Sequence, residues 1–204
     1  MYFIFGYLFK IRKSAFFMAE YNFLQRKRDV LKKFDKSHEG TWDEHIVKLC
    51  NKINSKENYY TTSSCSGRIL LMIDQDKKGS GLFLWKSHEK IDLSVFRKFF
   101  ESFKGKSPIK FKCEPPILHV VCKTINDAEE LLEKGFKSGW KKSGIISLRK
   151  NIVLELHGTE KLEFPILKDG KILVEDQFLK LIVEKSNKKL EKGWDKIVSL
   201  EKLI

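Results

Sequence analysis

The chain has 204 residues, and its 42% hydrophobic and 33% charged residues are the balance of a globular protein, which excludes an intrinsically disordered one. Its 4 Pro and 12 Gly exclude collagen-like and Pro/Gly-rich low-complexity architectures. A net charge of +13 favours an anionic partner, with nucleic acid as the first candidate and an anionic membrane surface as the second.

Residues 1–17 are aromatic and basic and contain no acidic residue. In a secretory signal the positive charge precedes the apolar run, whereas Lys10, Arg12 and Lys13 follow it here. Two interpretations remain: an amphipathic surface anchor, or a start codon assigned too far upstream, with Met18 opening the chain. We favour the second, and expect an extension over residues 1–17 and a single domain over residues 18–204 of a cytoplasmic protein.

In the next part of the chain, apolar residues recur with the period of an α-helix in three stretches. Thr41 and Glu44 have the spacing of a capping box, which predicts that the second helix begins here. The stretches between are rich in strand formers. The predicted helices are residues 22–34, 43–55 and 92–103, and the predicted strands are residues 59–62, 68–74 and 82–86.

The second half of the chain continues with grouped strands. Asn126 and Glu129 again have capping-box spacing and predict a short helix to Lys134, with Gly135 at its C-terminus. A lysine-rich helical pattern over residues 177–203 is interrupted near Gly193. The predicted strands are residues 109–113, 117–123, 145–149, 152–156 and 162–164.

Because strands cluster instead of alternating singly with helices, the sequence predicts an α+β domain of mostly antiparallel strands with packed helices. The glycine fingerprints of dinucleotide-binding Rossmann folds and of Walker loops are missing, so the fold is expected to be non-Rossmann. A helix, a Ser-Gly pair and a hydrophobic strand occur in both halves, at Ser66-Gly67 and at Ser143-Gly144. Internal duplication is one interpretation of this echo, and chance is the other.

The cysteines and histidines form no local metal-binding or redox motif, since no Cys-x-x-C and no His-Glu-x-x-His spacing is present. Four scattered thiols in a chain of this length fit a reducing compartment. We therefore expect no metal, with a site assembled only in three dimensions left open. The cysteines are Cys50, Cys65, Cys113 and Cys122.

The strongest local feature is the run Tyr-Tyr-Thr-Thr-Ser-Ser-Cys-Ser-Gly-Arg at residues 59–68. Small hydroxylated residues expose backbone N–H groups and add short donors, and Arg68 supplies a forked cation. The run therefore suits a nest for an anion or a polar ligand. A Ser-rich turn between two strands is the simpler interpretation.

Two further segments carry residue types that do chemistry. Glu114 and His119 stand among apolar strand residues, where shifted pKa values make acids and bases, although a surface Glu and a core His are the simpler interpretation. An indole beside a cation and an imidazole, at residues 85–88, suits stacking on a base, unless Trp85 is a core residue. Lysines interspersed with Trp140 and Trp194 fit either a phosphate backbone with exposed bases or a solvated surface.

Together and in order, these segments resemble the tRNA wybutosine-synthesising protein 3 family, methyltransferases of the wyosine pathway, in an archaeal-type single-domain form. The resemblance lies in the ten-residue run at 59–68, in Trp-x-x-Ser-His at 85–88 (one residue tighter than expected) and in Glu-Pro-x-x-Leu-His-Val at 114–120. Ser143-Gly144 follows a short helix, as the family pattern requires. The resemblance covers roughly residues 23–164. One departure is Leu156-His157, where the family pattern has Ile-Arg, and His157 would weaken a contact to RNA or cofactor or make it pH-dependent.

The resemblance implies S-adenosylmethionine-dependent methylation of N4 of a 4-demethylwyosine-type base adjacent to the anticodon of phenylalanine tRNA. The implied cofactor is S-adenosylmethionine, and the implied partners are the anticodon loop of that tRNA and the other wyosine-pathway enzymes, with no membrane and no metal. Glu114 or His119 would accept the proton of the ring nitrogen, with Leu118 and His119 lining one cavity. The cofactor-binding residues expected are Ser63, Ser64, Ser66, Gly67, Arg68, Leu118, Ser143 and Gly144.

Two other classes of function stay open at the level of sequence. A non-catalytic tRNA-binding accessory protein would use the Ser-rich segment to grip a phosphate. A peripheral membrane protein would be anchored by residues 2–17. Binding of the methyl donor discriminates the enzyme from the first alternative, and sedimentation with liposomes discriminates it from the second.

Overall fold

The computed structural model describes residues 21–32, 43–75 and 79–204. A helix at residues 21–31 precedes the labelled elements. The helices that follow are α2 (Glu44–Ser55), α3 (Leu93–Ser102), α4 (Ile125–Lys137) and α5 (Asp176–Leu203). The strands are β1 (Tyr59–Cys65), β2 (Arg68–Ile73), β3 (Phe83–Ser87), β4 (Ile109–Glu114), β5 (Ile117–Cys122), β6 (Gly144–Ser147), β7 (Ile152–His157), β8 (Leu162–Lys168) and β9 (Lys171–Ile172).

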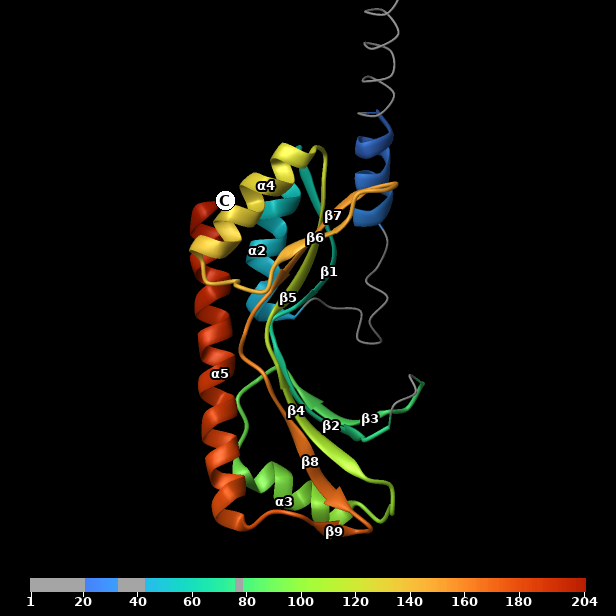
Figure 1. Cartoon of the computed structure of the whole chain (residues 1–204), viewed down its shortest axis with the longest axis vertical. Helices are drawn as coiled ribbons and strands as arrows, with labels where there is room; N and C mark the ends of the chain where they lie inside the picture. Colours follow the sequence, from blue (N-terminus) through green and yellow to red (C-terminus); the bar gives the residue numbers. More distant parts are fainter. Residues whose placement is uncertain (1–20, 33–42, 76–78) are drawn as a thin grey trace, which may run out of the picture.

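The described strands form two sheets, in the orders β1-β5-β7-β6 and β3-β2-β4-β8-β9, and every pairing between them is antiparallel. We call them the upper and the lower sheet, after their places in Figure 1. The α+β class and the antiparallel strands predicted from the sequence are confirmed. The sheets take alternating segments of the chain, so they do not correspond to two halves of the sequence, and the structure gives no support to an internal duplication.

Three pairs of strands run from one sheet into the other and cross at one level, which we call the junction (Figure 1). β1 continues into β2 through Ser66 and Gly67, β4 into β5 through Pro115 and Pro116, and β7 into β8 through residues 158–161. Gly67 has a φ of +104°, and a Cβ there would lie 3.1 Å from the carbonyl oxygen of Glu114. Glycine is therefore required where the first crossover passes the second.

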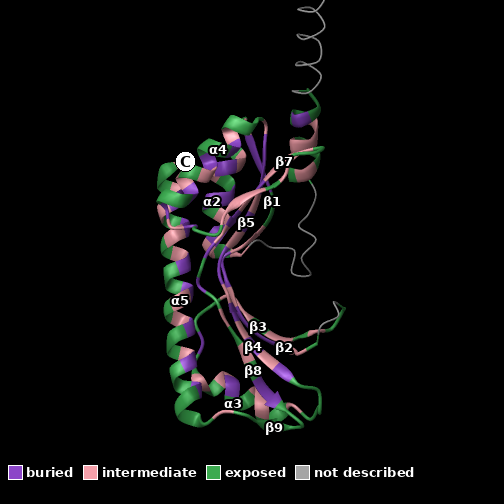
Figure 2. Ribbon diagram, viewed as in Figure 1, coloured by how far each residue is buried: buried purple, intermediate pink, exposed green. Residues whose placement is uncertain are grey.

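The helices α2, α3, α4 and α5 lie on one side of the sheets, and α5 extends along both (Figure 1). Buried residues recur along α5 and through both sheets (Figure 2). Gly193 lets α5 approach the junction, because a Cβ at this position would lie 2.9 Å from Cδ of Pro116. The interruption of this helix predicted near Gly193 is wrong, because the glycine serves close packing inside a continuous helix.

On the opposite face of the sheets, which we call the open face, helix 21–31 is the one described helix, and it covers one end (Figure 1). There Phe23 packs on Tyr60, with a distance of 5.3 Å between their ring centroids, and on Val121. Since side chains alternate between the faces of a strand, Ile117 and His119 of β5 point to the same face as Val121. Between helix 21–31 and the junction, no element of the described residues covers the open face.

Local details differ from the predicted ones. Asp43 caps α2, and Thr41 lies outside the described residues. Thr124 and Asp127 form the capping box of α4, so the predicted pair of Asn126 and Glu129 is wrong. Gly135 does not end this helix but lies inside it against Leu156, where a Cβ would come within 2.7 Å of a methyl group. No helix in the described part of the chain combines the length and apolarity that crossing a bilayer requires.

Candidate active site

A cleft of about 450 Å³ opens at the junction between the two sheets. Residues from all three crossings contribute to its wall, so the topology itself brings together positions that are far apart in the sequence. The cleft is lined by Cys65, Arg68, Lys112, Glu114, Pro115, Ile117, Lys142, His157 and Lys161.

Glu114 forms the centre of an ion-paired group in the wall of this cleft. Arg68 Nε donates to its Oε2 over 2.7 Å, and Lys112 Nζ lies 2.7 Å from its Oε1. Burial alone would raise the pKa of Glu114, but the hydrogen bonds and charges of Lys112 and Arg68 outweigh burial and hold this pKa below its ordinary value. Glu114 is therefore ionised near neutral pH and is a weak proton acceptor.

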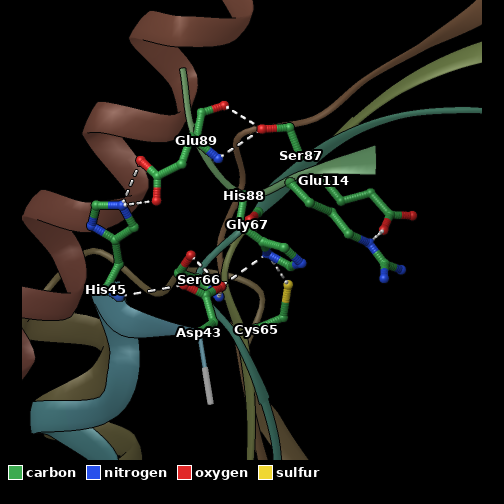
Figure 3. A network of polar contacts seen from close by, with 10 residues as sticks. Asp43, His45, Cys65, Ser66, Gly67, Ser87, His88, Glu89 and Glu114 are labelled. Carbon is green, nitrogen blue, oxygen red and sulfur yellow. Dashed lines mark hydrogen bonds and ion pairs between the residues drawn. The ribbon is translucent and has the colours of Figure 1, made fainter. Parts of the chain in front are cut away.

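Beneath this wall, Asp43 binds the first crossover (Figure 3). Its Oδ2 accepts hydrogen bonds from the backbone N–H, over 2.9 Å, and from the hydroxyl of Ser66. The same oxygen lies 2.9 Å from Nδ1 of His88, which also lies 3.0 Å from the carbonyl oxygen of Gly67 and 3.7 Å from Sγ of Cys65. The network holds the crossover between Cys65 and Arg68, both of which line the cleft.

The charge state of this cluster follows from its hydrogen bonds. The carboxylate of Asp43 and the sulfur of Cys65 outweigh burial and raise the pKa of His88 to about 10, so His88 is an imidazolium near neutral pH. Asp43, Cys65 and His88 are also metal-ligand types, and their ligand atoms lie within 4.8 Å of one another. Hydrogen bonding within the protein accounts for this arrangement, which no local spacing in the sequence indicates.

A second polar chain crosses the open face next to the cleft. Ser63, His119 and Glu155 lie side by side on β1, β5 and β7. The hydroxyl oxygen of Ser63 lies 2.6 Å from Nδ1 of His119, and Nε2 of His119 lies 2.8 Å from Oε2 of Glu155. When Nε2 donates to Glu155, Nδ1 accepts from Ser63, whose side chain is exposed.

The structure separates seven of the ten predicted site residues into three groups. Arg68 and Glu114 line the cleft, and Gly67 forms its first crossover. Ser63 and His119 lie together on the open face but are not part of the cleft wall. The hydroxyl of Ser143 accepts a hydrogen bond from the backbone N–H of His157 and so helps to position that cleft residue. Gly144 follows Ser143, and a Cβ added to Gly144 would have no neighbouring atom within 4 Å.

The other predicted contributors point elsewhere. Leu118 is fully buried against the helices, so the expectation that it shares a cavity with His119 is wrong: neighbours along a strand face opposite sides. Ser66 is buried, and its hydroxyl donates a hydrogen bond to the carboxylate of Asp43, so it is not available to a ligand. Ser64 lies beside the buried Cys50. The predicted Ser-rich loop is mostly strand, because β1 extends to Cys65.

The three tryptophans in the described part of the chain pack against other residues of the protein, which contradicts a role in holding exposed bases. Trp85 contacts Phe96 edge to face, and Trp140 is fully buried, with its indole N–H donating to the carbonyl of Lys196. Trp194 stacks on His45 with 3.8 Å between ring centroids.

Among the cleft-lining residues with a thiol or a charged side chain, sequence reasoning did not single out four as site residues. These are Cys65, Lys112, Lys142 and Lys161. The strand pattern of β4 could have revealed Lys112, because this residue stands two positions before Glu114 and therefore on the same face of the sheet. Lys142 and Lys161 lie outside the strands, and only the crossings bring them to the cleft. His157, noted as a departure from the family pattern, also lines it.

Comparison with known proteins finds relatives whose names refer to tRNA methylation and wybutosine synthesis. A methyltransferase from Thermococcus sibiricus, named tRNA(Phe) 7-((3-amino-3-carboxypropyl)-4-demethylwyosine(37)-N(4))-methyltransferase, is 37% identical over 91% of this chain and 95% of its own length. The tRNA wybutosine-synthesizing protein 3 homolog of Mus musculus is 34% identical over 82% of this chain and 66% of its own length.

The fold matches solved structures as well. The structure of the PH1069 protein from Pyrococcus horikoshii superposes with a TM-score of 0.82 at 33% identity and covers 90% of this chain and 94% of that one. A hypothetical protein from Aeropyrum pernix gives a TM-score of 0.68 at 26% identity, over 79% of this chain and 96% of that one. The family model described as "Methyltransferase TYW3" matches residues 25–204, and the chain belongs to this family of methyltransferases.

Proposed function

We propose that this methyltransferase transfers a methyl group from S-adenosylmethionine to N4 of a 4-demethylwyosine-type base, adjacent to the anticodon of phenylalanine tRNA. The names of the relatives give the base and the tRNA, and the excess of positive charge fits an RNA substrate. The proposed substrate base is already tricyclic, so the enzymes that build it act before this methyltransferase and are its partners in the pathway. We place these enzymes and the methyltransferase in the cytoplasm, where tRNA is modified.

The residues of the junction cleft fit such a donor. Its volume lies within the roughly 300–1,000 Å³ typical of small-molecule sites. The amino-acid end of the donor is a zwitterion, and Arg68 and Glu114 offer one charge of each sign in contact with each other. Pro115 and Ile117 add apolar surface beside them. Arg68 would hold the carboxylate of the donor and Glu114 its ammonium group.

S-adenosylmethionine supplies an electrophilic methyl group when it is bound. Because the transfer of this group is favourable, the task of the protein is to position the reactants and to accept the proton that leaves the ring nitrogen. Ser63 is the exposed end of a chain through His119 to Glu155. In our proposal the hydroxyl of Ser63 contacts the base and passes the proton to Nδ1 of His119, and Glu155 stabilises the imidazolium that forms.

Of the two proton acceptors that the sequence suggested, His119 is therefore the better one. Glu114 is held as a carboxylate by two cations, which lowers its basicity. His119 has a hydroxyl on one ring nitrogen and a carboxylate on the other, the arrangement that directs a proton onto a histidine. Glu114 serves in binding.

The observation that carries the proposal is the position of Arg68 and Glu114 together in one cleft, next to the Ser63–His119–Glu155 chain. The test is methylation of phenylalanine tRNA isolated from cells that lack this step, with isotopically labelled S-adenosylmethionine. We expect one labelled methyl group on the tricyclic nucleoside, identified by mass spectrometry of the digested tRNA. Transfer to another nucleoside, or no transfer with donor bound, would contradict the proposal.

A further inference from the structure

We propose that Lys142, His157 and Lys161 form an anion subsite on one wall of the cleft, and that this subsite holds a phosphodiester group of the RNA substrate. The proposal rests on the function proposed above and divides its cleft into a wall for the donor and a wall for the RNA backbone.

Backbone hydrogen bonds place the three residues. The N–H of Lys142 donates to the carbonyl of His157 over 3.2 Å, and the N–H of His157 donates to the hydroxyl of Ser143 over 3.0 Å. Lys161 stands at the end of the third crossover, where its N–H donates to the carbonyl of Thr159. The three side chains therefore start from ordered backbone and converge on the same cleft.

The balance of charge differs between the two walls. Arg68 and Lys112 both contact Glu114, so the first wall contains its own carboxylate. On the second wall Lys161 pairs with Glu163, whose carboxylate also lies 4.0 Å from Lys112. Lys142 has an exposed side chain and contacts no carboxylate within the part of the chain that is described. The second wall therefore carries uncompensated positive charge.

His157 adds a polar group whose orientation is fixed. Its Nδ1 lies 2.7 Å from the carbonyl oxygen of Gly158, which makes Nδ1 the protonated nitrogen. The other nitrogen, Nε2, can take up a proton and then donate to an anion. Two lysines and an imidazole are a donor set typical of phosphate binding.

The electrostatics of the donor argue against its binding to this wall. S-adenosylmethionine carries a sulfonium, an ammonium and a carboxylate, so its net charge is positive, and the uncompensated charge of Lys142 on this wall repels it. The paired charges of Arg68 and Glu114 suit its zwitterionic end. An RNA phosphodiester is a pure anion and fits Lys142 and Lys161, and its contact releases counterions.

The test compares the affinity of the full chain for an anticodon stem-loop RNA at several salt concentrations. The variants are Lys142→Ala and Lys142→Arg, and the matched control is Lys192→Ala, which removes an exposed lysine from α5 on the helix-covered side. A plot of the logarithm of the RNA association constant against the logarithm of the salt concentration has a negative slope. Lys142→Ala should make this slope less steep by about 0.7–0.9, the value for one lost phosphate contact. Lys142→Arg should restore the wild-type slope, and Lys192→Ala should retain it.

The affinity of each variant for S-adenosylmethionine alone, measured by calorimetry, identifies the source of the anion. Unchanged donor affinity together with a reduced RNA slope in Lys142→Ala supports the subsite. An unchanged RNA slope overturns it, and so does a loss of donor affinity, which would mean that Lys142 holds the carboxylate of the donor. Failure of the wild-type protein to methylate RNA would overturn the proposed function instead, because the slope is measured without donor.

Discussion

The carboxylate of Asp43 lies 2.9 Å from Nδ1 of His88, and this ion pair joins the residue that caps α2 to the residue that follows β3. The same carboxylate accepts two hydrogen bonds from Ser66. Two elements of the scaffold therefore fix the crossover at the base of the cleft. The cleft residues on either side, Cys65 and Arg68, depend on this anchor for their position.

The anchor predicts a specific dependence of stability on pH. Asp43 raises the pKa of His88 from 6.5 to about 10 in the folded state. A raised pKa contributes stability that is fully present below about pH 6.5 and is lost as the pH rises through about 10. His88→Ala should therefore lower the free energy of unfolding by about 1–3 kcal/mol near neutral pH, because it leaves the largely buried carboxylate of Asp43 without its charged partner.

Urea unfolding of the wild type and of His88→Ala, from neutral pH to about pH 10, checks this prediction. The difference in unfolding free energy between the two proteins should shrink steadily as the pH rises. A difference that stays constant over this range would show that His88 does not act through its positive charge.

The Ser63–His119–Glu155 chain predicts a separation of catalysis from binding. Ser63→Ala and His119→Ala should each lower kcat by about 10²- to 10⁴-fold, the usual contribution of a positioned proton acceptor. The dissociation constant of S-adenosylmethionine should stay at its wild-type value, because neither side chain lines the cleft. Single-turnover rates and donor titrations measure the two quantities. Full activity in His119→Ala would remove this residue from the mechanism.

Substitutions of Arg68 and Glu114 should have the opposite effect: they should weaken donor binding more than they lower the catalytic rate. Arg68→Ala removes the cation for the donor carboxylate and leaves Glu114 with Lys112 alone, so donor affinity should fall by at least about 10-fold. Glu114→Gln should weaken donor binding while the rate at saturating donor changes little. Retained affinity with a large fall in the saturated rate of Glu114→Gln would instead make Glu114 the proton acceptor.

Gly193 predicts a steric effect at the junction. A methyl group at this position would lie 2.9 Å from Cδ of Pro116, so Gly193→Ala should destabilise the protein by about 1–3 kcal/mol. This is the net change expected after the gain of about 1 kcal/mol that alanine usually brings to a helix. Gly144→Ala is the control, because no atom lies within 4 Å of a Cβ there, and its unfolding midpoint in urea should stay close to that of the wild type. Equal midpoints for both variants would contradict the close contact.

The elements were predictable from the sequence because their signals are local. The alternation of buried and partly buried residues in β4, and the apolar period of α2, are visible within a few positions. The glycines were less predictable: Gly135 and Gly193 were assigned to helix breaks, yet both allow close contact with a distant segment, with Leu156 and Pro116 respectively. A glycine in a helix is ambiguous until its neighbours in space are known.

The candidate site was predictable only in part, for a related reason. Arg68 and Glu114 stand in distinctive motifs, and the register of β2 and β4 places them opposite each other. Lys142 and Lys161 stand in ordinary lysine-rich segments and reach the cleft only because three strand crossings meet at one level. Asp43 likewise finds His88 through the packing of α2 against the junction, and no spacing in the chain encodes that contact.

A crystal structure of the protein with S-adenosylmethionine bound tests most directly whether the cleft between the sheets is the donor site. We expect electron density for the donor in this cleft, with its carboxylate within hydrogen-bonding distance of Arg68 and its ammonium group beside Glu114. Density on the helix-covered side, or in a pocket that contacts neither Arg68 nor Glu114, would contradict it.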